Sequence, residues 1–228
     1  MASKLSESID ACKQASAAAG GNVLVALSGG KDSLAVLDLC KKTFDHVEAF
    51  YLYLVDGLEC VERHLFAIAK RYDVKVHKVP HPILAKTLRT STFMPAWDGT
   101  YERAGTVSFS DMEALARKRA GIEWTAYGER VNDSIERRAK IEKVGMVHES
   151  TRRVYPIAFW KEREVYAYLQ AHKIPLPVRL GNGKTSGFGL SGEILTFLKR
   201  EWPADFKRVL EVYPFAEALV YREEHIKR

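Results

Sequence analysis

Six residues, SGGKDS at positions 28–33, constrain the fold of this chain more than any other stretch. They follow the short apolar run VLVAL, which is typical of a strand buried on both faces of a parallel sheet. The residues after the loop, 32–43, have the pattern of a helix. Glycines let backbone amides approach a ligand closely, and a helix N-terminus presents unpaired N–H groups. Strand, loop and helix together predict an anion-binding site.

Strands and helices are predicted to alternate along the first third of the chain. The apolar segments 22–28, 47–55 and 73–79 are the strands, and segments 32–43 and 58–72 are the helices between them. Such alternation indicates a parallel sheet with right-handed crossovers. We therefore expect an α/β fold: an open, parallel, twisted sheet of Rossmann-like form with helices on both faces. In such sheets ligands bind at the carboxyl ends of the strands, where the SGGKDS loop lies.

The remaining chain predicts further elements around this sheet. Helices are expected at 3–18, 109–120 (with Phe109, Met112, Leu115 and Ala116 inward), 161–172, 192–200 and 203–212, a strand at 122–128 and an apolar segment at 154–160. His172 is expected at a helix end, and the last residues are expected to fray. Residues 80–107 show no clear period and predict either a functional flap or a plain surface loop.

A change in composition after residue 177 predicts that the chain has two parts. Residues 1–177, with an N-terminal helix in 1–21, form the predicted nucleotide-binding α/β domain. Residues 178–228 form a glycine-rich loop and a helical extension. Within the loop, GNGKTSGFGLSG has five glycines in twelve residues, which indicates a mobile lid or a plain turn.

Charge and cysteine content narrow the class of protein. The net charge of +6 favours anionic ligands such as nucleotides and allows nucleic acid. No apolar run approaches the roughly 18 residues that span a membrane, and the N-terminus has no apolar signal core. We therefore expect a cytoplasmic protein without a membrane partner. Cys12, Cys40 and Cys60 are widely spaced and lack zinc-site spacing, so no zinc is expected, and Cys40 is predicted to be a buried, inert thiol.

The loop carries side chains suited to phosphate. Ser28 and Ser33 add hydroxyl groups and Lys31 adds a cation, whereas Asp32 is expected to cap the helix or to assist a magnesium ion. The loop is not a Walker A motif, because Asp32 follows Gly-Lys and Val25 stands where the first glycine is required. A second Gly-Lys-Thr at 183–185 lacks that glycine too.

VALSGGKDSLAVL resembles the pyrophosphate-loop signature of the adenine nucleotide α-hydrolase-like superfamily. That superfamily includes ATP pyrophosphatases, the sulfate adenylyltransferase small subunit and phosphoadenosine phosphosulfate (PAPS) reductases. Segments 53–60 (YLVDGLEC), 127–140 (YGERVNDSIERRAK) and 156–177 resemble the PAPS reductase and sulfate adenylyltransferase branch, so the resemblance covers residues 22–177.

The resemblance implies a set of site residues. Those implied for the nucleotide and pyrophosphate are Ser28, Gly29, Gly30, Lys31, Asp32, Ser33, Asp56, Gly128, Arg130, Ser134 and Arg137. Lys31, Arg130 and Arg137 are the expected catalytic residues: Lys31 adds a cation for the pyrophosphate, and the planar guanidinium groups of the two arginines suit phosphate or sulfate oxygens. No side chain is assigned as a metal ligand. The mixed charges of residues 129–143 also fit an ordinary solvated helix face.

The sequence departs from the reductases in one respect. PAPS reductases carry a catalytic cysteine near the C-terminus, whereas this sequence has no cysteine after Cys60. The cysteine pairs that hold an iron–sulfur cluster in related reductases are absent from it as well, so no such cluster is expected.

Three functions follow as alternatives. The first is an enzyme that binds ATP with Mg²⁺, cleaves between the α and β phosphates and transfers AMP to an acceptor, releasing pyrophosphate. A sulfate-like anion, a carboxylate and a nucleic-acid base are all open as acceptors. The second is a PAPS-binding, reductase-like enzyme that uses an external thiol. The third is a nucleotide-binding subunit without turnover, since no general base stands out. The resemblance also allows a homodimer.

Overall fold

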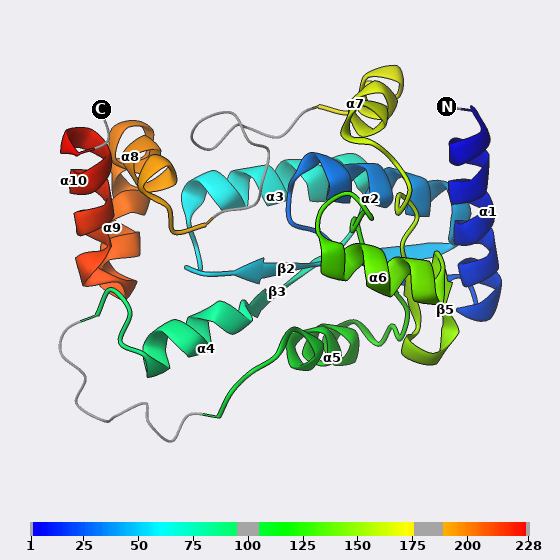
Figure 1. Ribbon diagram of the computed structural model, residues 1–228, viewed down its shortest axis with the longest axis horizontal. Helices are drawn as coiled ribbons and strands as arrows, with labels where there is room; N and C mark the ends of the chain where they lie inside the picture. Colours follow the sequence, from blue (N-terminus) through cyan, green and yellow to red (C-terminus); the bar gives the residue numbers. More distant parts are fainter. Residues whose placement is uncertain (1, 95–104, 176–188, 227–228) are drawn as a thin grey trace.

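The computed structural model describes residues 2–94, 105–175 and 189–226 (Figure 1). Its centre is a six-stranded sheet in the order β3-β2-β1-β4-β6-β5, with every neighbouring pair parallel except β5 and β6. The strands are β1 (Asn22–Ala26), β2 (His46–Tyr53), β3 (Val76–Pro80), β4 (Thr125–Ala126), β5 (Val147–His148) and β6 (Arg153–Val154). The predicted α/β class with a largely parallel sheet is confirmed.

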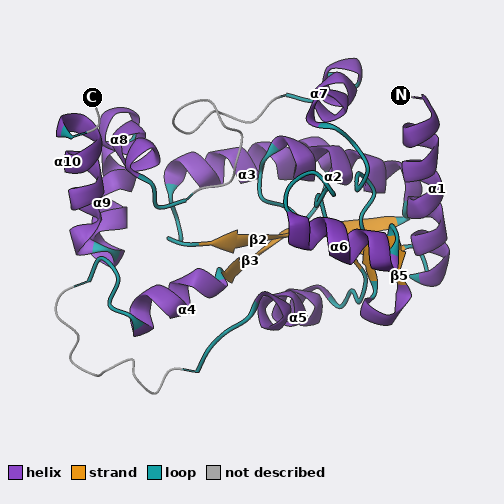
Figure 2. Ribbon diagram, viewed as in Figure 1, coloured by secondary structure: helices purple, strands orange, loops and turns teal. Residues whose placement is uncertain are grey.

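Helices cover both faces of this sheet (Figure 2). They are α1 (Ala2–Ala18), α2 (Lys31–Thr43), α3 (Glu59–Tyr72), α4 (Pro82–Arg89), α5 (Phe109–Ala120), α6 (Ile135–Val144), α7 (Glu162–Ala171), α8 (Gly192–Glu201), α9 (Pro203–Val212) and α10 (Glu217–His225), with short 3-10 turns at Glu149–Thr151 and Pro214–Ala216.

The apolar run in β1 is explained by its burial on both faces. Val23 and Val25 pack in the core cluster that α1, α2, α3 and α7 share, whereas Leu24 faces α5 through a second cluster. All three side chains are fully buried. A strand covered on both sides needs an unbroken hydrophobic sequence, because successive side chains point to opposite faces.

The order of strands places the 28–33 loop at a switch point. From β1 the chain first builds outward through β2 and β3, and it later returns to add β4 on the other side. The segments that follow β1 and β4 therefore diverge at neighbouring carboxyl ends, which is where open α/β sheets bind ligands.

The C-terminal helices form a separate apolar cluster. Leu195, Leu198, Val209 and Tyr213 are fully buried there, and Leu58, just before α3, joins them. Figure 1 shows α8, α9 and α10 at the end of the molecule opposite α1. These helices thus pack against the segment that follows β2 as well as against one another.

Several local expectations were wrong. Residues 80–107 were expected to lack regular structure, but α4 begins there, with proline at its first position and a cap from His81, whose ring accepts the Ile83 amide at 3.0 Å. Residues 95–104 of that segment lie outside the described residues, as do residues 181–188 of the glycine-rich loop. Phe109 is 60% exposed rather than inward, whereas Glu113 is buried.

The last residues, 221–228, were expected to fray, but residues 221–225 belong to α10, and residues 227–228 lie outside the described part of the chain. Helix α10 packs on α8, Val220 is buried, and Lys199 of α8 pairs with Glu224 at 3.1 Å. His172 does lie at the end of α7, as expected. No helix among the residues described above is both long enough and apolar enough to cross a membrane.

Candidate nucleotide site

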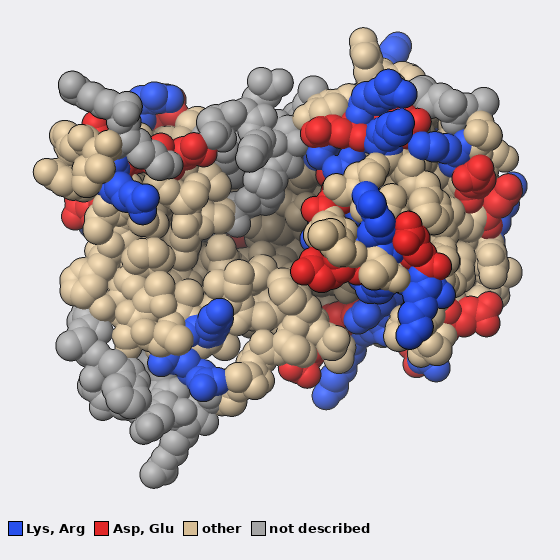
Figure 3. Space-filling view, in the orientation of Figure 1, with Lys and Arg blue, Asp and Glu red and all other residues tan. Residues whose placement is uncertain are grey.

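A pocket of about 970 Å³ lies at the carboxyl ends of β1, β2 and β4. Its wall includes the 28–33 loop, the end of β2 around Phe50, and the segment after β4 that contains Gly128 and Arg130. Figure 3 shows the surface hollowed at this place, with Lys, Arg, Asp and Glu side chains mixed on the side of α6 and α7. The pocket brings together residues that the sequence places a hundred positions apart.

The first turn of α2 has no side-chain cap. Gly30 occupies the cap position in extended conformation and has no side chain that could accept the first amides of the helix. By contrast Ser108, Ser134 and Ser191 cap α5, α6 and α8 through their hydroxyl groups. Because the first amides of a helix have no partner within it, the start of α2 offers N–H donors and a positive dipole end to the pocket.

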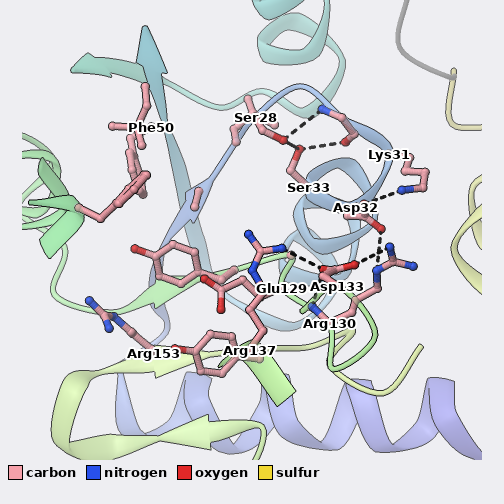
Figure 4. Close-up of a pocket in the computed structure, with 18 of the residues that line it drawn as sticks. Ser28, Lys31, Asp32, Ser33, Phe50, Glu129, Arg130, Asp133, Arg137 and Arg153 are labelled. Carbon is pink, nitrogen blue, oxygen red and sulfur yellow. Dashed lines mark hydrogen bonds and ion pairs between the residues drawn. The ribbon is translucent and has the colours of Figure 1, made fainter. Parts of the chain in front are cut away.

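The two serine hydroxyls stabilise the loop. Ser33 donates to the carbonyl of Gly30 at 2.9 Å, Ser28 donates to Ser33 at 3.3 Å, and the Gly30 amide donates to Ser28 at 3.3 Å. These bonds appear at the top of the close-up in Figure 4. The hydroxyls therefore hold the loop in an open curve around the start of α2.

Lys31 is nearly buried and already paired. Its Nζ lies 2.7 Å from Asp32 Oδ2 and 3.5 Å from Glu162 Oε1 at the start of α7, and it sits 5.9 Å from the centre of the Tyr166 ring. The side chain is 10% exposed. Lys31 thus joins the loop to α7 and must exchange partners to meet a phosphate.

Arg130 and Arg137 hold different positions. Arg130 is buried, with its Nη2 2.8 Å from Asp133 Oδ1 and its Nε 3.3 Å from Asp32 Oδ1. Arg137 is half exposed and has one contact, from Nη1 to Asp133 Oδ2 at 3.2 Å, while it extends into the pocket from α6 (Figure 4). Arg130 therefore links the 28–33 loop to the segment after β4, whereas Arg137 keeps N–H donors that face the pocket.

Of the remaining predicted site residues, some lie at the pocket and others do not. Gly128 packs on the loop, since a Cβ there would lie 3.1 Å from the carbonyl carbon of Asp32. Ser134 caps α6 and does not line the pocket. Asp56 is half exposed and pairs with Lys78 at 2.8 Å, so the structure does not bring it to the pocket wall.

Several lining residues were not singled out from the sequence. Lys140 pairs with Glu129 and lies 4.7 Å from the centre of the Tyr155 ring. Arg153 on β6 binds the buried carboxylate of Glu113, with Nε 3.1 Å from Oε2. No local motif marks these residues; they meet only because α6, β6 and α5 are assembled around β4.

The buried Glu113 is held ionised. Burial alone would raise its pKa, but the hydrogen bond from Arg153 and the charges of Arg117 and Arg153 outweigh burial and lower the pKa below its ordinary value. Arg117 in turn donates to the hydroxyl of Thr125 in β4 at 2.9 Å. This network fixes the position of Arg153 in the pocket wall.

The pocket offers few protein ligands to a magnesium ion. In residues 2–94, 105–175 and 189–226, no three His, Cys, Asp or Glu side chains are grouped to hold a metal. One carboxylate oxygen does fit: Asp32 Oδ1 is buried and accepts no hydrogen bond among the described residues, and its ion pair with Arg130 Nε is long, at 3.3 Å. Mg²⁺ is usually bound by one or two carboxylates together with substrate phosphates, so Asp32 suits an ion that arrives with a nucleotide.

Two solved structures are similar to this chain, and the first of them supports the fold. A crystal structure of PAPS reductase from Candida auris, in a phosphate complex, is similar at a TM-score of 0.50 and 17% identity, covering 75% of this chain and 82% of that one. The U34-tRNA thiolase NcsA from Methanococcus maripaludis, with its [4Fe-4S] cluster, matches at a TM-score of 0.48 and 15% identity, covering 98% and 80%. No curated protein matches the sequence.

The fold and the loop define a member of the adenine nucleotide α-hydrolase-like superfamily. Within it, residues 22–181 match the phosphoadenosine phosphosulfate reductase domain, which is most of the chain. The chain therefore belongs to the PAPS reductase domain family. The matched segment is nearly the one, 22–177, on which the resemblance in the sequence rests.

Proposed function

We propose that the protein is an enzyme that binds ATP with Mg²⁺ in this pocket, cleaves the bond between the α and β phosphates and transfers AMP to an acceptor, releasing pyrophosphate. One observation carries the proposal: the uncapped start of α2 lies at the switch point of the sheet and lines a pocket of about 970 Å³. Helix N-termini of this kind bind phosphate, and the volume accommodates a nucleotide with an acceptor beside it.

The residues of the site would have different roles in this reaction. The amides of the 28–33 loop and Lys31 would bind the departing pyrophosphate, since they lie at the start of α2. Arg137 would contact the α-phosphate or the acceptor, and Arg130 would keep Asp32 and Asp133 in place. Asp32 would hold Mg²⁺, which supplies positive charge against the phosphates when bound. Electrostatic stabilisation of the leaving group would be the main source of rate enhancement.

Family membership favours a second candidate, a PAPS-binding enzyme that takes its thiol from another molecule. None of the three cysteines lines the pocket, and the sequence has none beyond Cys60. Burial, with a hydrogen bond to Asp205, raises the pKa of the Cys60 thiol to about 12. A thiolate nucleophile for PAPS would therefore have to come from outside this chain.

The test is a calorimetric titration with ATP and Mg²⁺ and with PAPS, paired with an assay of released pyrophosphate. The variant Ser28→Ala/Lys31→Ala removes loop groups, and Ser6→Ala/Lys13→Ala on the exposed surface of α1 is the matched control. ATP binding that only the loop variant loses, with pyrophosphate released on addition of an acceptor, would support AMP transfer.

The other outcomes separate the alternatives. Sulfate, a carboxylate and a short RNA would be supplied in turn as acceptors. Preference for PAPS, with sulfite released only when a thiol is added, would favour the second candidate. Binding of ATP without pyrophosphate release under any of these conditions would favour a nucleotide-binding subunit without turnover. If neither ligand bound, the proposed site would be wrong.

A further inference from the structure

A histidine from α3 contacts the phosphate loop. The Nε2 of His64 lies 2.9 Å from the carbonyl oxygen of Gly29, although 35 residues separate the two in sequence. A carbonyl oxygen can only accept a hydrogen bond, so Nε2 carries the proton and donates. Neither the loop signature nor the pattern of α3 predicts this contact.

The imidazole ring also fills the space beside Gly29. A Cβ at that position would lie 3.0 Å from Cδ2 of His64 and 3.1 Å from its Nε2. Gly29 has φ +76°, in the left-handed region that favours glycine. Glycine is therefore required at position 29 both by its backbone conformation and by the ring packed against it.

The hydrogen bond sets the direction of one peptide group. In a planar trans peptide the carbonyl oxygen and the following N–H point to opposite sides. With the Gly29 carbonyl turned to α3, the Gly30 N–H points away from α3, and it donates to Ser28 inside the loop. A Gly–Gly peptide without this anchor would rotate easily and could turn its carbonyl dipole toward a bound anion, which opposes binding.

The helix that carries His64 is firmly held. Leu65 and Ile68, on the inner face of α3, are buried in the main core. At the start of the helix Asp205 accepts the amides of Glu59 and Cys60 at 2.7 and 2.8 Å. The packing and capping of α3 therefore fix the position of His64 relative to the loop.

From these contacts we infer that His64 is a positioning residue, which fixes the Gly29–Gly30 peptide in the orientation that lets the loop bind the pyrophosphate group of a nucleotide. The inference rests on the proposed function, because the ligand group is taken from it. His64 does not line the pocket and acts only through the loop.

The peptide can be observed directly by NMR. The sequence contains two Gly-Gly pairs, Gly20-Gly21 and Gly29-Gly30. Protein made with glycine labelled with carbon-13 in the carbonyl and nitrogen-15 in the amide gives carbonyl–amide correlations for these pairs alone, and Gly20-Gly21 is the internal reference. His64→Phe keeps a ring but removes the donor, and His64→Gln restores an N–H near Nε2. The matched control is His172→Phe, since the His172 ring contacts the Tyr168 carbonyl at 2.9 Å away from the loop.

The expected result is a shift of the Gly29-Gly30 signal in His64→Phe, largely reversed in His64→Gln and absent in the control. Titrated with inorganic pyrophosphate, His64→Phe should bind about tenfold more weakly with its melting temperature unchanged, and His64→Gln should recover most of the affinity. Equal affinity in wild type and His64→Phe would overturn the inference and leave the proposed function standing. An equal loss in His64→Gln and His64→Phe would overturn it as well. If wild type bound neither pyrophosphate nor ATP, the inference about His64 and the proposed function would both be wrong.

Discussion

Asp205 caps a helix that begins 146 residues earlier in the chain: its Oδ1 accepts the amide of Glu59 at 2.7 Å. The second carboxylate oxygen accepts the next amide of α3, and Arg208 donates to the carbonyl of Asp56 at 2.7 Å. The C-terminal helices are thereby bound to the segment between β2 and α3 by polar contacts as well as by their apolar cluster.

Replacing Asp205 with alanine should lower the free energy of unfolding by about 1–3 kcal/mol, because two amides lose their acceptor in a buried place. Urea denaturation would measure the change. Asp10→Ala, on the exposed surface of α1, is the control and should change little. Equal stabilities of the two variants would show that the cap contributes nothing.

Gly128→Ala should weaken nucleotide binding. The added methyl group would lie 3.1 Å from the Asp32 carbonyl carbon and 3.2 Å from the Ser33 nitrogen, both of them backbone atoms that cannot turn aside. The start of α2 would have to move away from β4. Gly105→Ala, where no atom lies within 4 Å, is the control for loss of glycine itself. Unchanged ATP affinity in Gly128→Ala would contradict the close packing of loop and strand.

Arg130 and Arg137 should differ when each is replaced by alanine. Loss of Arg130 leaves Asp32 and Asp133 without their shared partner, so we expect unfolding to become easier by about 3 kcal/mol and nucleotide binding to weaken. Loss of the half-exposed Arg137 should weaken binding with little change in stability. Thermal unfolding and calorimetry on both variants would check this, and a stability loss of similar size in Arg137→Ala would refute the distinction.

The folded protein should have no fast-reacting thiol. Cys12 and Cys40 are fully buried, and burial together with the hydrogen bond that the thiol donates to Asp205 raises the pKa of Cys60 to about 12. At about pH 8 the thiols should therefore react with a disulfide reagent far more slowly than free cysteine, whose pKa is about 8.5. All three should react after unfolding in urea. One equivalent released rapidly from the native protein would be inconsistent with this arrangement.

Glu113 should contribute to unfolding at acid pH. Its pKa is lowered in the folded state relative to the ordinary value of 4.5, so its contribution to stability is fully present above that value. The contribution is lost as the pH falls through the lowered pKa, because the unfolded chain then binds the proton more tightly. Glu113→Gln should therefore be less stable at neutral pH but lose less stability on acidification. Denaturation curves at several pH values would give the free energy of unfolding as a function of pH. If Glu113→Gln lost as much stability on acidification as wild type, the prediction would be wrong.

The centre of the fold could be predicted because its signals are local. The apolar run of β1 and the glycine loop are contiguous, and the inward residues of α7, Val165, Tyr168 and Leu169, recur at helical spacing. Helix α4 was missed because it is short and follows an irregular-looking proline segment. Strand β5 is two residues long and exists only through pairing with β6.

The site could be predicted only in part, for a related reason. Ser28, Lys31 and Gly128 follow strand ends, so their meeting at one edge is a consequence of the sheet. Glu162 and His64 reach the loop from helices whose sequences show only ordinary amphipathic patterns. Asp56 was placed by resemblance, yet it turns to Lys78 on the neighbouring strand. Contacts of this kind depend on how helices are set against the sheet, which local pattern does not determine.

The ion pairs of the pocket limit which free ions can occupy it. Among the described residues, every lysine and arginine that lines it already has a carboxylate within 4 Å: Lys31, Arg130, Arg137, Lys140 and Arg153. A chloride or a single sulfate from the medium that bound to these side chains would have to separate the pairs without offering enough contacts in return, which leaves it only the amides at the start of α2. A ligand that supplies several phosphate oxygens and its own cation can replace both halves of the pairs at once. The pocket should therefore stay selective in the presence of abundant small anions, and ionic strength should affect its affinity less than five lysine and arginine side chains would suggest.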